Sequence, residues 1–347
     1  MLAILCLLAG LAAAGLDLRI KGWNDPFERG PTECVKGFFI GLVFVSHISG
    51  YLSGGGAALP SDRIARGVLG LFGQMTVVMF FVYSGYGVMK SIMTKGEAYV
   101  KAMPKRRIAR TLFRFDIAVC AFLVLNILLG TRPGVGKTAL SLVAWDSLGN
   151  SNWYIFAALL CYAVTWAWAL VFRTPQKPGI AALSALTGAF VLCIAALSLV
   201  KESWWYDTMM AYPLGCIFAA REERIITWLR KRYWALAAGA AACFVALLKT
   251  APDAHGIVGN ARAVLFGLLV VLAMMKARLS SASLKWMGRN LFALYIYQRL
   301  PMIAFAAIGG GAFPRGHPDI YLWVSAASTL MIAALPELVN CMRSKKL

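Results

Sequence analysis

Charged residues are scarce in this sequence, and acidic ones are the scarcest. Only 14% of the 347 residues are charged, and 15 Asp and Glu stand against 35 Lys and Arg. Soluble domains contain about 25% charged and about 45–50% apolar residues. Here 60% of the residues are hydrophobic and the mean hydropathy is +0.69. This composition excludes an ordinary soluble domain and predicts an integral membrane protein.

Cysteine is too dispersed to build a framework. Eight cysteines lie apart along the chain without a CxxC spacing, and seven of them fall inside apolar segments. The pattern argues against a disulfide scaffold and against a zinc site, so we expect no metal and no tightly bound cofactor. The sequence also has no obvious repeat, no low-complexity tract and no loop long enough to form a soluble domain.

Long apolar runs are what the sequence has in abundance. About 20 apolar residues suffice for a helix to cross the hydrocarbon core of a bilayer. We predict an all-α polytopic membrane protein with about eleven transmembrane helices. An additional helix within 1–20 precedes a ten-helix domain at 32–341, and a short basic tail follows at 342–347. The apolar segments lie at 1–18, 36–52, 67–93, 112–130, 152–172, 179–200, 204–220, 233–249, 260–277, 287–308 and 319–341.

The cations are distributed unevenly between alternate loops. One set of loops and ends holds 26 of the 35 Lys and Arg residues, the other set holds eight, and Arg299 falls inside an apolar segment. Cytoplasmic loops of membrane proteins are enriched in Lys and Arg. The asymmetry predicts an external N-terminus and a cytoplasmic C-terminus. It also explains the net charge of +20 without nucleic acid as a partner.

The first apolar run resembles a secretory signal peptide, because LLAGLAAAG ends in small residues. A signal peptide begins with cations that face the cytoplasm. Here the first cation is Arg19, after the run. We therefore interpret this run as a transmembrane helix that passes from outside to inside.

The segment KGFFIGLVFVSH, residues 36–47, carries a cation at one end and an imidazole at the other. Eleven helical steps place Lys36 and His47 on the same face, about 16 Å apart. With Lys36 at the cytoplasmic surface, His47 lies near the middle of the bilayer, where an ionisable group is costly and usually functional. The alternative is an imidazole that merely bonds to a neighbouring helix or to water.

Two further segments carry candidate functional residues. Ser84 and Gly85 in VMFFVYSGYG allow either substrate approach or close helix packing. Arg106, Arg110 and Arg114 recur every four residues and form a cationic stripe. Such a stripe suits a polyphosphate, and anchoring to anionic lipid is the alternative.

The tenth apolar segment contains polar residues in its interior. Gln298 and Arg299 lie too deep to be end anchors, and Pro301 removes a backbone donor and loosens the helix. A buried arginine needs a carboxylate, a phosphate, carbonyls or water as partner. Asp207 and Glu337 are the candidate carboxylates.

Together these motifs resemble those of the acyltransferase-3 family of polytopic membrane acyltransferases, over about residues 32–341. The similar features are, in chain order, Lys36 and His47 with ten residues between them, the FFxxSG pattern of Phe80, Phe81, Ser84 and Gly85, the RxxR pair Arg107 and Arg110, NWYIF from residue 152, and GRNLFALYIY. Where the family often has Tyr-Leu-Ile-His, this chain reads Tyr295, Ile296, Tyr297, Gln298.

The resemblance implies an enzyme that moves an acyl group from cytoplasmic acyl-CoA, most simply acetyl-CoA, to a hydroxyl of a sugar or lipid-linked glycan across the membrane. His47 is the expected catalytic residue, either as general base or as an acylated relay. Lys36, Arg107 and Arg110 are expected to bind acyl-CoA. The expected acceptor-binding or supporting residues are Ser84, Gln298 and Arg299. A bacterial cytoplasmic membrane is the expected location.

A transporter or flippase is the alternative from another class. His47 and Arg299 would then serve proton-linked transport or substrate binding. The sequence lacks an inverted-repeat signal, and its cations concentrate in one loop, between the third and fourth segments. Both observations favour the acyltransferase.

Overall fold

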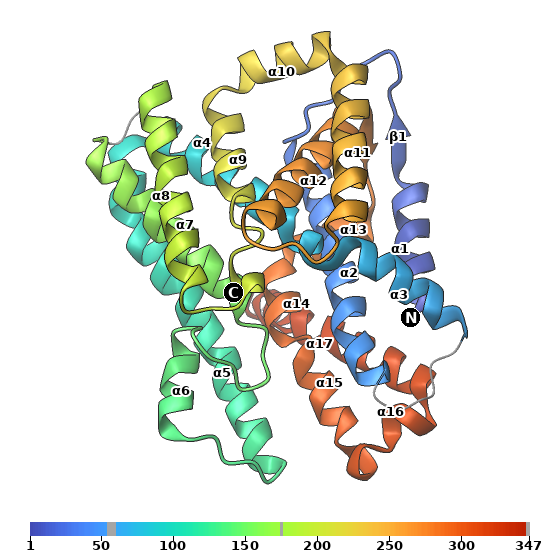
Figure 1. The fold of residues 1–347 in the computed structure, drawn as a ribbon. Helices are drawn as coiled ribbons and strands as arrows, with labels where there is room; N and C mark the ends of the chain where they lie inside the picture. The colour runs from blue at the N-terminus through green and yellow to red at the C-terminus, as the bar shows by residue number, and fades with distance from the viewer. Residues whose placement is uncertain (54–59, 174–175, 345–347) are drawn as a thin grey trace.

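The computed structural model describes residues 1–53, 60–173 and 176–344 (Figure 1). Residues 345–347 of the predicted basic tail lie outside this range. Almost every described element is a helix. In chain order the main elements are α1 (Leu2–Ala14), β1 (Leu16–Leu18), α2 (Arg29–Ser53), α3 (Pro60–Phe72), η1 (Gly73–Val77), α4 (Val78–Met103), η2 (Pro104–Ala109), α5 (Arg110–Leu128), α6 (Val135–Leu142), α7 (Trp153–Val171), α8 (Ile180–Ser198), η3 (Ser203–Trp205), α9 (Ala211–Ala220), α10 (Glu222–Lys231), α11 (Tyr233–Thr250), α12 (Ile257–Lys276), β2 (Ala277–Leu279), α13 (Ala282–Arg289), α14 (Leu291–Tyr297), α15 (Arg299–Ala306), η4 (Ile308–Gly311), α16 (Phe313–Gly316) and α17 (Pro318–Ser344).

Most of these helices are long and apolar. Within the described chain, seven helical stretches are long and apolar enough to cross a bilayer, and three shorter apolar helices accompany them. Every predicted segment falls on one of these stretches, and Asp62–Leu128 takes two of them. The prediction of an all-α multi-pass membrane protein is therefore confirmed. The count of eleven spans and their orientation remain predictions.

The first helix is shorter than predicted. It ends at Ala14, whereas the apolar segment was expected to run to residue 18, and Leu16–Leu18 instead pair antiparallel with Ala277–Leu279. A Cβ on Gly15 would overlap the Ser280 carbonyl, so glycine permits this close approach. Thirteen helical residues span about 20 Å, less than the roughly 30 Å of a hydrocarbon core.

The helix predicted at 204–220 begins only at Ala211. The residues before it form the short 3₁₀ helix η3 and turns, which the carboxylate of Asp207 holds against α12. Its oxygens lie 2.6 Å from the His255 ring nitrogen Nδ1 and 2.6 Å from the Gly256 backbone nitrogen, just before the first turn of α12. A local polar contact therefore interrupts the apolar run.

The predicted weakness around Pro301 is confirmed. The helix is divided into α14 and α15 at Gln298, three residues before the proline. Pro301 has no N–H to donate to the carbonyl of Tyr297. Gln298 keeps helical angles (φ −56°, ψ −33°), so the hydrogen bonding is interrupted while the chain keeps its direction.

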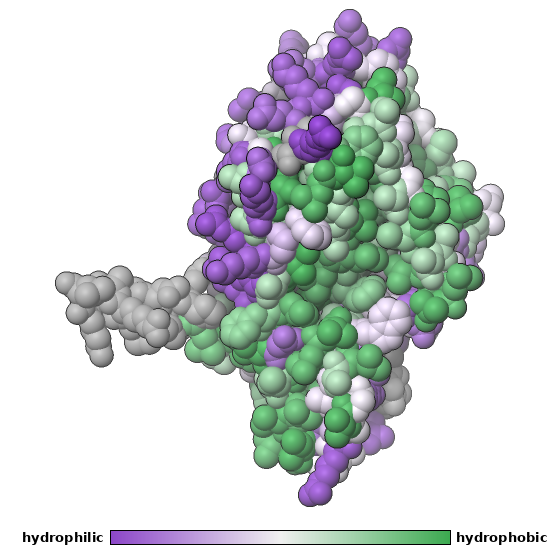
Figure 2. All heavy atoms as spheres, turned by 90° about the vertical axis from the view of Figure 1, so that its left-hand side faces the viewer, coloured by the Kyte–Doolittle hydropathy of each residue, from purple (hydrophilic) through white to green (hydrophobic). Residues whose placement is uncertain are grey.

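Apolar side chains cover much of the outer surface, as a lipid environment requires. Figure 2 shows hydrophilic residues gathered over the upper part of one face, with a largely apolar surface below. Helix α8 is apolar on all sides, and Val191 and Leu192 on it are 52% and 71% exposed. A helix of this kind faces lipid or a deep core.

Glycines bring the helices that carry the polar residues close together. A Cβ on Gly85 of α4 would overlap the Tyr212 carbonyl of α9, and a Cβ on Gly37 of α2 would overlap the Leu284 carbonyl of α13. Small residues allow such close helix packing in membranes. These contacts fix α2 and α4, which carry Lys36, His47 and Ser84.

Candidate active site

A cationic cavity of about 800 Å³ lies between α2, α4, α5, α7 and α14. Its described lining contains no Asp or Glu. Such a surface suits a ligand with several phosphates. The cations that line it are Lys36, Lys95, Arg106, Arg107, Arg110 and Arg114.

Two irregularities of the backbone bring these cations together. Helix α4 bends at Gly96, whose φ of +59° is accessible mainly to glycine. The chain then passes through the π-helical turn η2 before entering α5. A π-helical turn changes the angular spacing of side chains and often occurs at functional sites. The sequence predicted the arginine stripe but neither the bend nor the wide turn.

Tyrosines form much of the remaining wall of this cavity. The Tyr162 hydroxyl lies 2.9 Å from the Ser84 hydroxyl, and the Arg107 Nε donates to the Tyr99 hydroxyl at 3.1 Å. Ser84 was expected to support the acceptor, yet it lines the same cavity as Lys36. The tyrosines were missed because no spacing in the sequence separates them from tyrosines that anchor helices at membrane surfaces.

His47 opens into a second cavity of about 480 Å³. The imidazole Nδ1 is buried and has no hydrogen-bond partner in the described chain. Trp153 and Trp204 face the same cavity. Its polar lining comes from Ser46, His47, Gln74 and Thr76. Aromatic rings with a few convergent polar groups are typical of small-molecule sites.

Two tyrosines separate the cavities. Tyr154 lines the cationic cavity and Tyr295 lines the His47 cavity, and their ring centroids are 5.0 Å apart at an interplanar angle of 61°. The Tyr295 ring in turn lies 6.4 Å from the His47 ring. Lys36 and His47 therefore open into different cavities that meet at this tyrosine pair.

Arg299 lies beside the His47 end of α2. Its Nη2 contacts the hydroxyl of Tyr51 at 3.4 Å, one helical turn after His47. Asp207 is not its partner, because that carboxylate binds His255 and Gly256. The side chain of Glu337 lies outside the described part of the chain.

Gln298 is separated from the other predicted site residues. It lines neither the cationic cavity nor the His47 cavity, but a third one on the α1 side of α2. In the described chain, no group of three or more His, Cys, Asp and Glu side chains gathers to hold a metal ion.

A comparison with family models decides the class. The acyltransferase domain model of the acyltransferase-3 family matches residues 32–336. The chain belongs to the acyltransferase-3 family. It is a multi-pass membrane acyltransferase, and the transporter alternative is not favoured. No curated protein and no solved structure matches it. Helix α1 lies outside the matched range.

Proposed function

We propose that this acyltransferase moves an acyl group, most simply acetyl, from cytoplasmic acyl-CoA to a hydroxyl of a sugar or cell-envelope glycan across the membrane. The observation that supports this best is the pair of unlike cavities that meet at Tyr154 and Tyr295. One is cationic, and the other combines an imidazole with tryptophans. The proposal includes a bacterial cytoplasmic membrane as the location.

The cationic cavity is the proposed donor site. Lys36, Arg107 and Arg110 face it with three further cations and no described carboxylate, so the phosphates of CoA find only attractive charges. The segment between the two apolar halves of Asp62–Leu128 is also the most basic one in the sequence, and the positive-inside rule assigns it to the cytoplasm. Donor site and cytoplasmic side therefore coincide.

The His47 cavity is the proposed acceptor site. The indoles of Trp153 and Trp204 offer flat apolar surfaces for the ring of a sugar, while Ser46 and Gln74 offer hydrogen bonds to its hydroxyls. Arg299 near His47 adds a cation that favours negative charge as it develops on an oxygen.

In the proposed reaction the acceptor hydroxyl attacks the thioester carbonyl while the imidazole of His47 takes its proton. The tetrahedral intermediate then collapses, the carbon–sulfur bond breaks, and the proton from His47 passes to the departing thiolate of CoA. The products are the ester and free CoA. In the covalent variant His47 attacks first and carries the acyl group, which would leave label on the protein before acceptor is added.

The experiment uses proteoliposomes, radiolabelled acetyl-CoA and a panel of free and lipid-linked glycans. We expect label to appear as an alkali-labile ester on glycan. Trp204→Ala should raise the acceptor KM about tenfold, the loss expected for one buried aromatic contact. Trp323→Ala is the matched control, because both indoles are 46% exposed and Trp323 does not line the His47 cavity. The proposal would be contradicted if the protein neither bound acetyl-CoA nor consumed it with any hydroxyl acceptor.

A further inference from the structure

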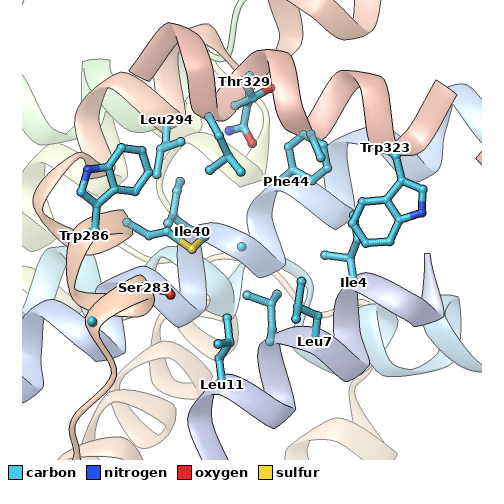
Figure 3. Close-up of a pocket in the computed structure, with 17 residues that line it drawn as sticks. Ile4, Leu7, Leu11, Ile40, Phe44, Ser283, Trp286, Leu294, Trp323 and Thr329 are labelled. Carbon is cyan, nitrogen blue, oxygen red and sulfur yellow. The ribbon is translucent and has the colours of Figure 1, made fainter. Parts of the chain in front are cut away.

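A third cavity, of about 640 Å³, lies between α1, α2, α13, α14 and α17 and reaches Gln298 just after α14 (Figure 3). It shares no lining residue with the donor cavity or the His47 cavity. Its volume falls within the range of about 300–1,000 Å³ that small-molecule sites have. We call it the α1 groove. Its apolar walls include Ile4, Leu7, Leu8, Leu11, Ile40, Phe44, Trp286, Leu294 and Trp323.

Helix α1, which precedes the residues that the family model matches, closes one side of this groove. Leu8 packs against Gly41 of α2, where a Cβ would come within 2.6 Å of the leucine methyl. Ile4, Leu7 and Leu11 then form one wall (Figure 3). Leu7 is 51% exposed, so the groove opens along α1 towards the surroundings of the helices. For a membrane protein those surroundings are hydrocarbon chains.

One polar atom in the α1 groove has no partner. The Gln298 side chain lines the groove and is 1% exposed. Its Nε2 donates to the Tyr295 carbonyl at 3.2 Å, whereas its Oε1 is buried with no partner in the described chain. Buried acceptors are rarely left unpaired. The Nε2 contact fixes which atom is the acceptor, so the missing group is a hydrogen-bond donor.

The depth of this oxygen limits what the donor belongs to. Seven helical steps from Leu291, where α14 begins, place Gln298 about 10 Å from that helix end. Figure 3 shows Trp286 and Trp323 at opposite ends of the groove, and tryptophans favour the two surfaces of a bilayer. A hydrogen-bond donor that reaches Gln298 therefore lies deeper in the membrane than a lipid head group, on or next to the lipid's hydrocarbon chain.

We propose that the α1 groove binds one hydrocarbon chain of a membrane lipid, and that this chain carries a hydroxyl or amide N–H near its head-group end that donates to Oε1 of Gln298. The apolar walls bind the chain, and Gln298 selects for the donor. A partner helix is about 10–12 Å across with its side chains, and a cavity of about 640 Å³ holds only a short piece of such a helix. The site is independent of acyl transfer.

The test uses the full-length protein in phospholipid nanodiscs doped with one of two photoactivatable phospholipids. Both carry a diazirine on one chain, and they differ only in a hydroxyl on the third carbon of that chain. We expect cross-links to concentrate on α1 and α13. The hydroxylated lipid should label these helices about three- to tenfold more than the plain one, as one hydrogen bond allows. Gln298→Leu should remove this preference and keep the plain labelling.

Ala326→Trp, which fills the groove from α17, should lower labelling of α1 several-fold. Leu192→Trp on the exposed face of α8 adds the same ring outside the groove and should change nothing. Labelling of α1 and α13 in the wild type that is no stronger than labelling of α8 would show only surrounding lipid and overturn the site. Equal labelling by both lipids in the wild type would overturn the role of Gln298. Both readouts use wild-type protein, so they stand even if a variant fails to fold.

Discussion

Tyr154 of α7 and Tyr295 of α14 stand with their ring centroids 5.0 Å apart, between the cavity of Lys36 and the cavity of His47. In the proposed reaction the thioester reaches His47 past this pair. We infer that, while no acceptor is bound, the two rings keep water in the His47 cavity away from the acyl group. Exclusion of water protects reactive intermediates in many enzymes.

The barrier predicts a specific defect. Tyr154→Ala should raise acyl-CoA hydrolysis without acceptor about tenfold, because the removed ring opens a path for water. Tyr154→Phe keeps the ring and should hydrolyse at the wild-type rate. Release of free CoA thiol, followed with a chromogenic reagent, measures both variants. An unchanged hydrolysis rate in Tyr154→Ala would show that the ring pair is not the barrier.

The cationic cavity predicts a contrast between neighbouring cations of α4, η2 and α5. Arg107→Ala and Arg110→Ala should each weaken acyl-CoA binding about tenfold or more, the range of a charge-assisted hydrogen bond. Lys101→Ala removes the same charge, but Lys101 is exposed, pairs with Glu97 at 2.7 Å and lies outside the cavity lining. It should bind acyl-CoA as the wild type does. Equal weakening in all three, measured by calorimetry, would favour anchoring to anionic lipid.

The packing of α4 on α9 predicts a loss of stability. Gly85→Ala places a methyl group against the Tyr212 carbonyl, and overpacking of this kind costs about 1–3 kcal/mol. Gly188→Ala, within α8, meets no atom within 4 Å and should be neutral or slightly stabilising, because alanine favours helix. Thermal unfolding in detergent should show a lower midpoint for Gly85→Ala alone. A midpoint for Gly85→Ala equal to that of Gly188→Ala would mean that the helices can separate without cost.

The cation asymmetry predicts the orientation in the membrane. In Figure 1, α10 lies at one end of the molecule and α6 and α16 lie at the other. Arg232 directly follows α10 and Arg278 lies in β2, whereas Thr138 lies in α6 and Gly316 ends α16. Reporter fusions after the first two should read cytoplasmic, and fusions after the last two external. The reverse pattern would place Lys36 at the external surface and remove the basis for a cytoplasmic donor site.

Periodicity and charge in the sequence were enough to predict the class of fold and most of the cations that line the cationic cavity. The arginine stripe and Lys36 were visible because charge inside an apolar chain is conspicuous. The proposed roles of Tyr154, Tyr295 and Trp204 were not visible in the sequence, because aromatic rings occur in protein cores, at membrane surfaces and in substrate sites alike. Gln298 was grouped with Arg299 from adjacency, yet neighbouring residues on a helix point about 100° apart. Gln298 lines the α1 groove, whereas Arg299 contacts the Tyr51 hydroxyl.

The two ends of α2 offer the most direct test of the account. Lys36 faces the cationic cavity, and His47 faces the other cavity. Substitutions of the two residues should therefore impair different steps. His47→Ala should bind acyl-CoA normally and lower transfer by about 10²–10⁴. Lys36→Ala should weaken acyl-CoA binding, and Lys36→Arg should largely restore it. The measurement is acyl-CoA affinity and acyl transfer to glycan for the three variants in nanodiscs. Normal transfer by His47→Ala, or wild-type affinity in Lys36→Ala, would contradict the assignment of donor and acceptor sides.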